Sequence, residues 1–173
     1  MRLGAPPGAS GDDKMTTTPF AEGPLELGFS PDNLAEALAA AARDGRAGEA
    51  ARLHLVAADQ ATRVDLRFGH VEAAAALAEV LEDPRLTLLV EAFEARLDSD
   101  VGDDADALTR IDAVLAEATA DANPNAWRLA LAVRFELLGR AGDAPPKAKT
   151  AARDAARRAG PWPGARWGIG DPP

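Results

Sequence analysis

Between residues 30 and 160, apolar residues recur every three or four positions, which is the spacing of amphipathic α-helices. Prolines that follow Ser30, Asp83 and Asn123 mark helix starts, because proline suits the first helical position. Glycines such as Gly45 mark helix ends. The pattern predicts an all-α fold of about seven antiparallel helices, joined by short turns and stacked as helical hairpins.

The same periodicity predicts which residues form the core. Two neighbouring helices in the middle of the chain place on their core faces Val71, Ala74, Ala78 and Leu81, and Leu86, Leu89, Val90, Phe93 and Leu97. The next helix buries Leu108, Ile111, Leu115 and Ala118. The helix that starts at Pro124 is apolar on two sides, with Trp127, Leu131, Phe135 and Leu138 on one and Leu129, Val133 and Leu137 on the other. It is therefore predicted to be the central helix.

Residues 62–69 are the one stretch with a different pattern. Val64, Leu66 and Phe68 alternate with charged residues, as in a half-buried strand. No second alternating run exists to pair with such a strand, so we predict helix or loop here.

The composition divides the chain into three parts. Residues 1–29 are rich in Gly, Pro and Thr without a sustained period, and are interpreted as a flexible leader. Residues 30–160 form the predicted helical-hairpin domain, and residues 161–173 are a tail rich in Pro and Gly. A methionine at Met15 leaves open whether it or Met1 is the true start.

A hexapeptide occurs twice, as GRAGEA at residues 45–50 and as GRAGDA at residues 139–144. Each copy lies between two predicted helices and offers a glycine for a left-handed helix end. Each also places an acid near the positive N-terminus of the following helix. Both copies are therefore predicted to form helix-hairpin turns.

Around the second copy the sequence resembles the tetratricopeptide repeat family. The residues that carry the resemblance are Phe135, Leu138, Gly139, Ala151 and Pro163. The match is partial, because Gly142 and Ala155 stand where the family has large aromatic residues, and the two hexapeptides lie 94 residues apart rather than a multiple of about 34. An irregular all-α bundle that reuses a good turn is the alternative.

The resemblance implies a concave surface that binds a peptide or another protein and performs no chemistry of its own. It also implies that the Ala-rich polar helix at residues 147–160 closes the array as a capping helix. The expected binding surface lies between an acidic middle and this basic helix, since residues 71–121 hold 14 Asp and Glu against three Arg.

Composition and charge exclude several other classes. The chain has 173 residues, 47% of them hydrophobic, and a formal net charge of −9, which argues against nucleic acid as the main partner. Cysteine is absent, so disulfides and Cys-based zinc sites are excluded. No secretory signal or run of about 18 apolar residues is found, and a soluble, cytoplasmic protein without contact to membranes is expected.

Acidic pairs at helical spacing suggest an enzymatic alternative. Glu91 and Glu94 resemble the E-x-x-E motif of the all-α nucleotide pyrophosphohydrolases, and Glu117 with Asp121 has one residue too many for the second half of that family's motif. This resemblance implies four ligands for Mg²⁺. The competing interpretation is a solvated acidic helix face.

The two histidines, His54 and His70, are 16 residues apart, so they are not one or two turns apart on a single helix. No serine lies near either of them, and neither a metal site nor a catalytic triad is indicated. Two structural or exposed histidines are predicted.

The tail holds Trp162 and Trp167 among prolines and glycines. Either it folds back and covers the end of the array, or it docks into a groove on a partner or a second copy. The sequence thus predicts a non-catalytic protein-interaction module that binds a protein or peptide without a cofactor, with Trp162 and Trp167 as candidate partner-binding residues. A self-associating structural bundle is a third possibility.

Overall fold

The computed structural model describes residues 30–160, which form seven α-helices and no strand. They are α1 (Pro31–Arg43), α2 (Ala47–Gln60), α3 (Val64–Leu81), α4 (Pro84–Val101), α5 (Asp104–Glu117), α6 (Pro124–Arg140) and α7 (Pro146–Ala159). The predicted all-α fold is confirmed. The predictions for the leader at residues 1–29, and for Trp162, Pro163 and Trp167, concern residues outside the described range.

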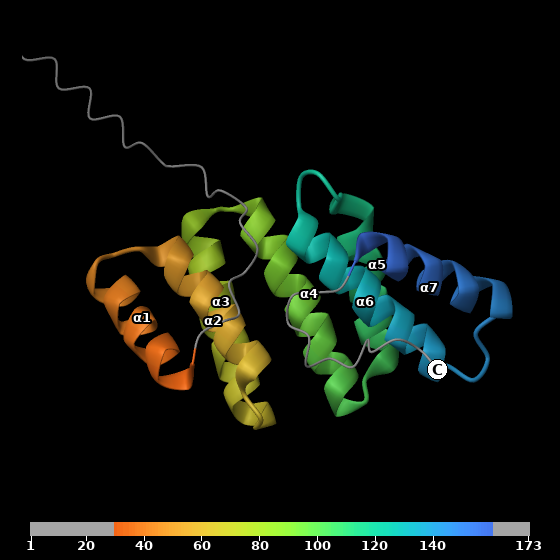
Figure 1. Cartoon of the computed structure of the whole chain (residues 1–173), viewed down its shortest axis with the longest axis horizontal. Helices are drawn as coiled ribbons and strands as arrows, with labels where there is room; N and C mark the ends of the chain where they lie inside the picture. The colour runs from red at the N-terminus through yellow and green to blue at the C-terminus, as the bar shows by residue number, and fades with distance from the viewer. Residues whose placement is uncertain (1–29, 161–173) are drawn as a thin grey trace, which may run out of the picture.

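The helices form a row in which each contacts the next along the chain (Figure 1). In addition α4 contacts α6, so both α4 and α6 touch three other helices. The prediction that α6 is central is therefore right, but α4 shares that position. No helix in the described part of the chain is long and apolar enough to cross a lipid bilayer.

Local signals set the helix starts. The Ser30 hydroxyl accepts a hydrogen bond from the Asn33 backbone N–H at 3.3 Å, and Pro31 occupies the first turn of α1. The Asp83 carboxylate accepts from the Arg85 N–H at 3.0 Å, which caps α4 in the same way. Residues 62–69 contain the start of α3 at Val64, so the preference for helix or loop over strand is confirmed.

The core follows the predicted faces closely. Its largest fully buried side chains come from α2, α4, α5 and α6 and include Phe93, Leu55, Leu97, Ile111 and Leu129. All five predicted core residues of α4 are buried. Leu81 is 39% exposed, so its assignment to the core was wrong. The reason is its position at the very end of α3, where Glu82 adopts a left-handed conformation and the chain turns away.

The first hexapeptide forms the predicted hairpin turn. Gly45 has φ +66°, and the Arg46 N–H donates to the Ala41 carbonyl at 2.9 Å while the Gly45 N–H donates to Ala42. These two bonds close the end of α1 in a Schellman motif, and Glu49 lies in the first turn of α2.

The second hexapeptide departs from the prediction. Gly139 and Arg140 are still part of α6, and Gly139 has no positive φ. The turn follows at residues 141–145, and Asp143 lies before the first turn of α7. Pro145 and Pro146 explain the difference, because a residue that precedes proline avoids the helical region and the next helix starts only at Pro146.

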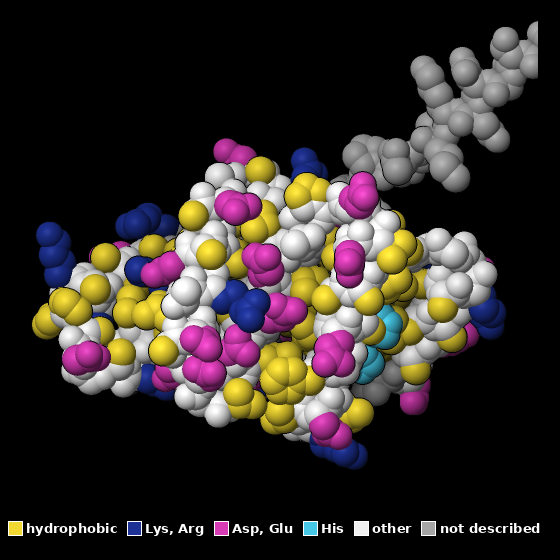
Figure 2. Space-filling view, turned by 180° about the vertical axis from the view of Figure 1, so that it is seen from behind, with side chains coloured by type: hydrophobic (Ala, Val, Ile, Leu, Met, Phe, Trp, Pro, Cys, Tyr) yellow, Lys and Arg dark blue, Asp and Glu magenta, His cyan; other side chains and the backbone are white. Residues whose placement is uncertain are grey.

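Arginines bridge neighbouring helices and engage much of the acidic middle. Asp100 on α4 pairs with Arg67 of α3 and with Arg96 of its own helix. Arg96 also pairs with Glu136 of α6. Further bridges are Arg110 to Glu94 and Asp98, Arg134 to Asp112, and Arg140 to Asp104. Figure 2 shows acidic and basic side chains interspersed on one face of the molecule. Five of the 14 carboxylates of residues 71–121 therefore join neighbouring helices.

The last helix has one buried and one polar face. Ala152, Ala156 and Ala159 are buried, whereas Lys147 and Arg158 are among its exposed residues. Ala151, which the tetratricopeptide resemblance assigns to the packed small position, is exposed.

Candidate functional site

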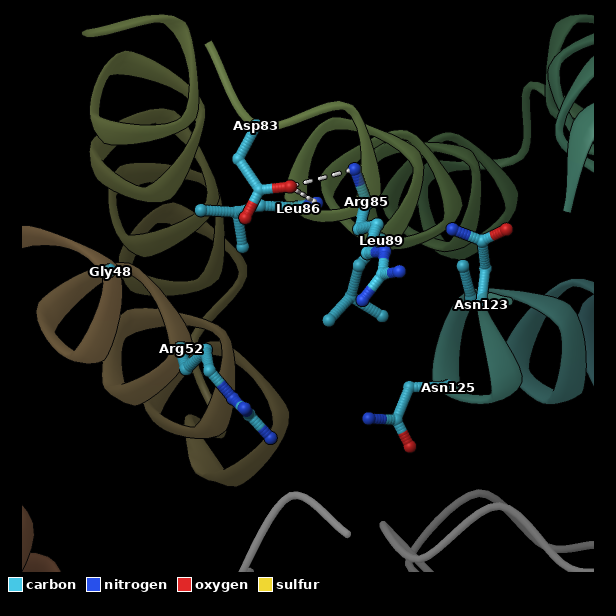
Figure 3. Close-up of a pocket in the computed structure, with 9 residues that line it drawn as sticks. Gly48, Arg52, Asp83, Arg85, Leu86, Leu89, Asn123 and Asn125 are labelled. Carbon is cyan, nitrogen blue, oxygen red and sulfur yellow. Dashed lines mark hydrogen bonds between the residues drawn. The ribbon is translucent and has the colours of Figure 1, made fainter. Parts of the chain in front are cut away.

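A pocket lies where the N-terminal ends of α2, α4 and α6 meet (Figure 3). It holds about 510 Å³ of empty space, counted out to its open mouth. The lining residues are Gly48 and Arg52 of α2, Asp83, Arg85, Leu86 and Leu89 of the α4 start, and Asn123, Asn125 and Ala126 of the α6 start. Because α3 and α5 return the chain between them, these three helices present their N-terminal ends on the same side.

Each wall of the pocket supplies polar side chains above an apolar base. Arg52 from α2 and Asn125 from α6 point into the same space, and Arg85 reaches toward it from α4 (Figure 3). Leu86 and Leu89 are 7% and 6% exposed and form the apolar base. The site can thus contact both a polar group and an adjoining apolar one.

The electrostatics of the pocket favour an anion. A helix N-terminus carries backbone N–H groups without intrahelical partners and a partial positive charge. At α4 the Asp83 carboxylate satisfies the N–H groups of Arg85 and Leu86, at 3.0 and 3.4 Å. No side chain caps the first turn of α2 or of α6. Arg52 and Arg85 contribute two positively charged side chains to the lining.

Asn123 is the buried polar group of this site. It is only 9% exposed, and its side chain makes no capping hydrogen bond although it occupies the N-cap position of α6. Its amide can donate to or accept from a polar ligand group in the pocket.

The pocket suits binding better than catalysis. Guanidinium groups hold carboxylates through paired N–H donors, and Asn amides add donors at fixed positions. The nine lining residues include no histidine, serine, threonine or lysine that could act as nucleophile or base. The one carboxylate, Asp83, is engaged in capping α4.

The four acidic residues of the pyrophosphohydrolase resemblance do not converge. Glu94 pairs with Arg110 at 2.8 Å, and burial, with smaller contributions from Asp98 and Glu91, raises its pKa against the effect of this arginine. Glu117 is the last residue of α5, and Asp121 lies in the loop that follows. Within residues 30–160 no three His, Asp or Glu side chains are grouped so that they could hold a metal ion.

The two histidines, in contrast, are brought together by the fold. His54 of α2 and His70 of α3 face each other with their Nδ1 atoms 3.0 Å apart, and both side chains are half-buried. Burial lowers the pKa of both, and the proximity of His70 lowers that of His54 further. The prediction of two structural or exposed histidines did not include a contact between them, which arises because a hairpin can join residues that are distant along the chain.

The pocket itself was missed in the sequence. The starts of α4 and α6 were predicted from Asp83-Pro84 and Asn123-Pro124, but their convergence depends on how the hairpins stack. Arg52 and Arg85 carry no local signal that separates them from other surface arginines. One helix lies between each two of these starts, so antiparallel stacking makes α2, α4 and α6 parallel to one another. This count of helices could have revealed the pocket.

Comparison of the chain with protein-family models, with curated proteins and with solved structures finds no significant match in any of the three. The tetratricopeptide resemblance therefore stays a prediction. The function has to be argued from the geometry of residues 30–160.

Proposed function

We propose that this chain is a non-catalytic protein-binding module that holds an acidic group of a partner segment in the pocket formed by α2, α4 and α6. The observation that carries the proposal is the convergence of three helix N-terminal ends with Arg52, Arg85 and the buried Asn123. The apolar base of Leu86 and Leu89 gives room for a neighbouring apolar side chain of the partner.

Two further features support binding of a protein. The helices form a row, and such rows offer extended surfaces along which a peptide can lie. Five of the 14 acidic residues of 71–121 are engaged in bridges between helices, and we place the expected binding surface at the pocket rather than in that region.

Selection from a displayed library of random peptides tests the proposal with no partner specified in advance. We expect the selected peptides to share an Asp, a Glu or a free C-terminal carboxylate. Replacing both arginines, Arg52→Gln with Arg85→Gln, should weaken their binding about a hundredfold or more, since each charge-assisted hydrogen bond contributes ~1.5–3 kcal/mol. Binding should also weaken as salt is raised.

The matched control is Arg158→Gln, which removes one exposed arginine from α7, away from the pocket. It should leave the affinity unchanged. Selected peptides without any acidic group, or equal binding by the double variant, would contradict the proposal. If binding were lost only in the double variant Trp162→Ala with Trp167→Ala, the partner would bind at those tryptophans and not in the pocket.

The enzymatic alternative is separated by one assay on the same material. A Mg²⁺-dependent pyrophosphohydrolase would release pyrophosphate from nucleoside triphosphates, and Glu94→Gln would abolish that release. We expect no release by the unaltered chain. A sedimentation measurement on the same sample identifies the third possibility, a defined self-associated bundle.

A further inference from the structure

The histidine pair between α2 and α3 has a geometry that suits a shared proton. The Nδ1 atoms are 3.0 Å apart and the ring centroids 5.3 Å apart, which places both nitrogens close to the line that joins the rings. The two ring nitrogens therefore point at each other. This is the arrangement of a hydrogen bond in which one neutral imidazole donates its N–H and the other accepts.

A metal ion does not fit between these nitrogens. Zinc lies about 2.0–2.1 Å from a histidine nitrogen, so an ion on the line between two of them needs a separation of roughly 4 Å. The observed 3.0 Å is too short for that. The pair is thus built for a proton, and protonation of both rings would leave two N–H donors facing each other with no acceptor.

We propose that His54 and His70 form an acid-released latch: the latch holds α2 on α3 as long as one ring can accept the other's Nδ1–H, and protonation of both rings breaks it. The α2 helix also carries two residues of the pocket wall, Arg52 two residues before His54 and Gly48 six residues before it. Acid release of α2 would therefore loosen that wall. This inference concerns the histidines alone and stands whether or not the pocket binds an acidic group.

Charged side chains of the neighbouring helices do not offset the effect of burial on the pKa of either histidine. Both imidazoles are half-buried, and burial lowers the pKa of each, with a smaller contribution from His70 to that of His54. Among the described residues no other side chain contributes to either shift. The charged residues on these helices and on their neighbours α1 and α4 include Glu36, Arg43, Arg52, Asp59, Arg67, Glu72, Arg96 and Asp100.

The sign of the pH dependence follows from the lowered pKa values. A histidine that protonates less readily in the folded chain than in the unfolded chain leaves stability intact above the ordinary pKa of about 6.5. Stability is then lost as the pH falls below that value, because the unfolded chain takes up more protons. Figure 2 shows both imidazoles side by side at the molecular surface, so solvent protons can reach them.

Nuclear magnetic resonance of the imidazole nitrogens in the full chain tests the latch directly. We expect two different neutral tautomers above about pH 7.5, one with the proton on Nδ1 and one with it on Nε2, and both rings should titrate below about 6.5. Identical tautomers with the proton on Nε2, or titration of both rings at or above that value, would overturn the proposal. This measurement needs no variant.

Two variants test the consequence for α2. His70→Gln and His54→Gln each keep a hydrogen-bonding side chain but leave one imidazole, so the fall in the unfolding temperature from about pH 7.5 to 5.5 should shrink by at least about half. Over the same range, amide exchange corrected for its intrinsic rate should accelerate in α2 more than in α6 in the unaltered chain but not in the two histidine variants. Glu36→Gln, an exposed change on α1, is the control and should behave as the unaltered chain. Equal acid sensitivity in all four proteins would overturn the latch.

Discussion

The turn after α1 and the turn after α6 contain nearly the same six residues, yet they are built differently. After α1, Gly45 leaves the helical conformation and the next helix begins two residues later at Ala47. After α6, Gly139 stays helical and α7 begins only at Pro146. The residues that follow decide the outcome, since the second copy is succeeded by two prolines and the first by a continuous helix.

The end of α4 also depends on a glycine. Gly102 ends α4 with φ +94°, and the Asp103 N–H donates to the Asp98 carbonyl at 2.8 Å. This is the hydrogen-bond pattern found at Gly45, although the segment shares with the hexapeptide only the glycine, an acid four residues later and the final alanine. A glycine at the right distance from the last helical turn, rather than a particular motif, produces this end.

Among substitutions in the two turns, that of Gly45 should change the free energy of unfolding most. Gly45→Ala forces a side chain into a left-handed conformation and should lower the free energy of unfolding by about 1–2 kcal/mol. Thermal unfolding should show this as a fall of roughly 2–8 °C for a chain of this size. Gly45→Asn is the control and should cost less, because asparagine tolerates that conformation. An unchanged unfolding temperature for Gly45→Ala would contradict the assigned turn.

The arginine of the second copy should have the next largest effect. Arg140 donates a hydrogen bond to the Ser99 hydroxyl of α4 and pairs with Asp104 of α5 at 3.1 Å. Arg140→Gln should therefore cost about 0.5–1 kcal/mol, a value limited by the partial exposure of the ion pair. Chemical denaturation at low and at high salt measures this loss, and only the ion-pair part should diminish with salt. A gain in stability would rule out the bridge.

Substitution of Gly139 should act in the opposite direction to that of Gly45. No atom lies within 4 Å of a methyl group placed on Gly139, and its backbone is helical. Gly139→Ala should stabilise the chain by about 0.5 kcal/mol, because alanine loses less conformational entropy on folding. The combined variant with Gly45→Ala should show the sum of the two effects, since the sites are far apart along the row of helices. Destabilisation by Gly139→Ala alone would mean that the second turn starts earlier than described.

The arginine of the first copy should have the smallest effect. Arg46 contacts only Asp44 and Glu49, its near neighbours in sequence, and all three side chains are exposed. Arg46→Gln should leave the unfolding temperature unchanged within the error of the scan. A loss as large as that of Arg140→Gln would show that the two arginines have equivalent roles.

The sequence predicted the features that depend on a few adjacent residues. The starts of α1, α4, α6 and α7 follow from proline at the first turn, and the buried residues of α4 follow from their spacing. The features that the sequence did not predict depend on residues far apart along the chain or on the residues that follow a turn. Gly139 was misplaced because the effect of Pro145 and Pro146 on the preceding turn was not considered, and the pairing of His54 with His70 needed the hairpin itself.

The candidate site shows the same division. Asn123 and Asp83 were assigned to helix starts, but nothing in either segment indicates that these starts share a pocket with Arg52. That arrangement needs the number of helices between them and the stacking of three hairpins. The four carboxylates that the pyrophosphohydrolase alternative implies as ligands, Glu91, Glu94, Glu117 and Asp121, do not form a group that could hold a metal ion in the described part of the chain.

The row-like contact pattern also determines how the molecule would respond to a pulling force. Within residues 30–160 every extensive contact joins consecutive helices, apart from that between α4 and α6. A force applied to the two ends should therefore peel α1 and α7 away singly, each at low load. The unit of α4, α5 and α6 is closed by the additional contact and should therefore yield in one larger step.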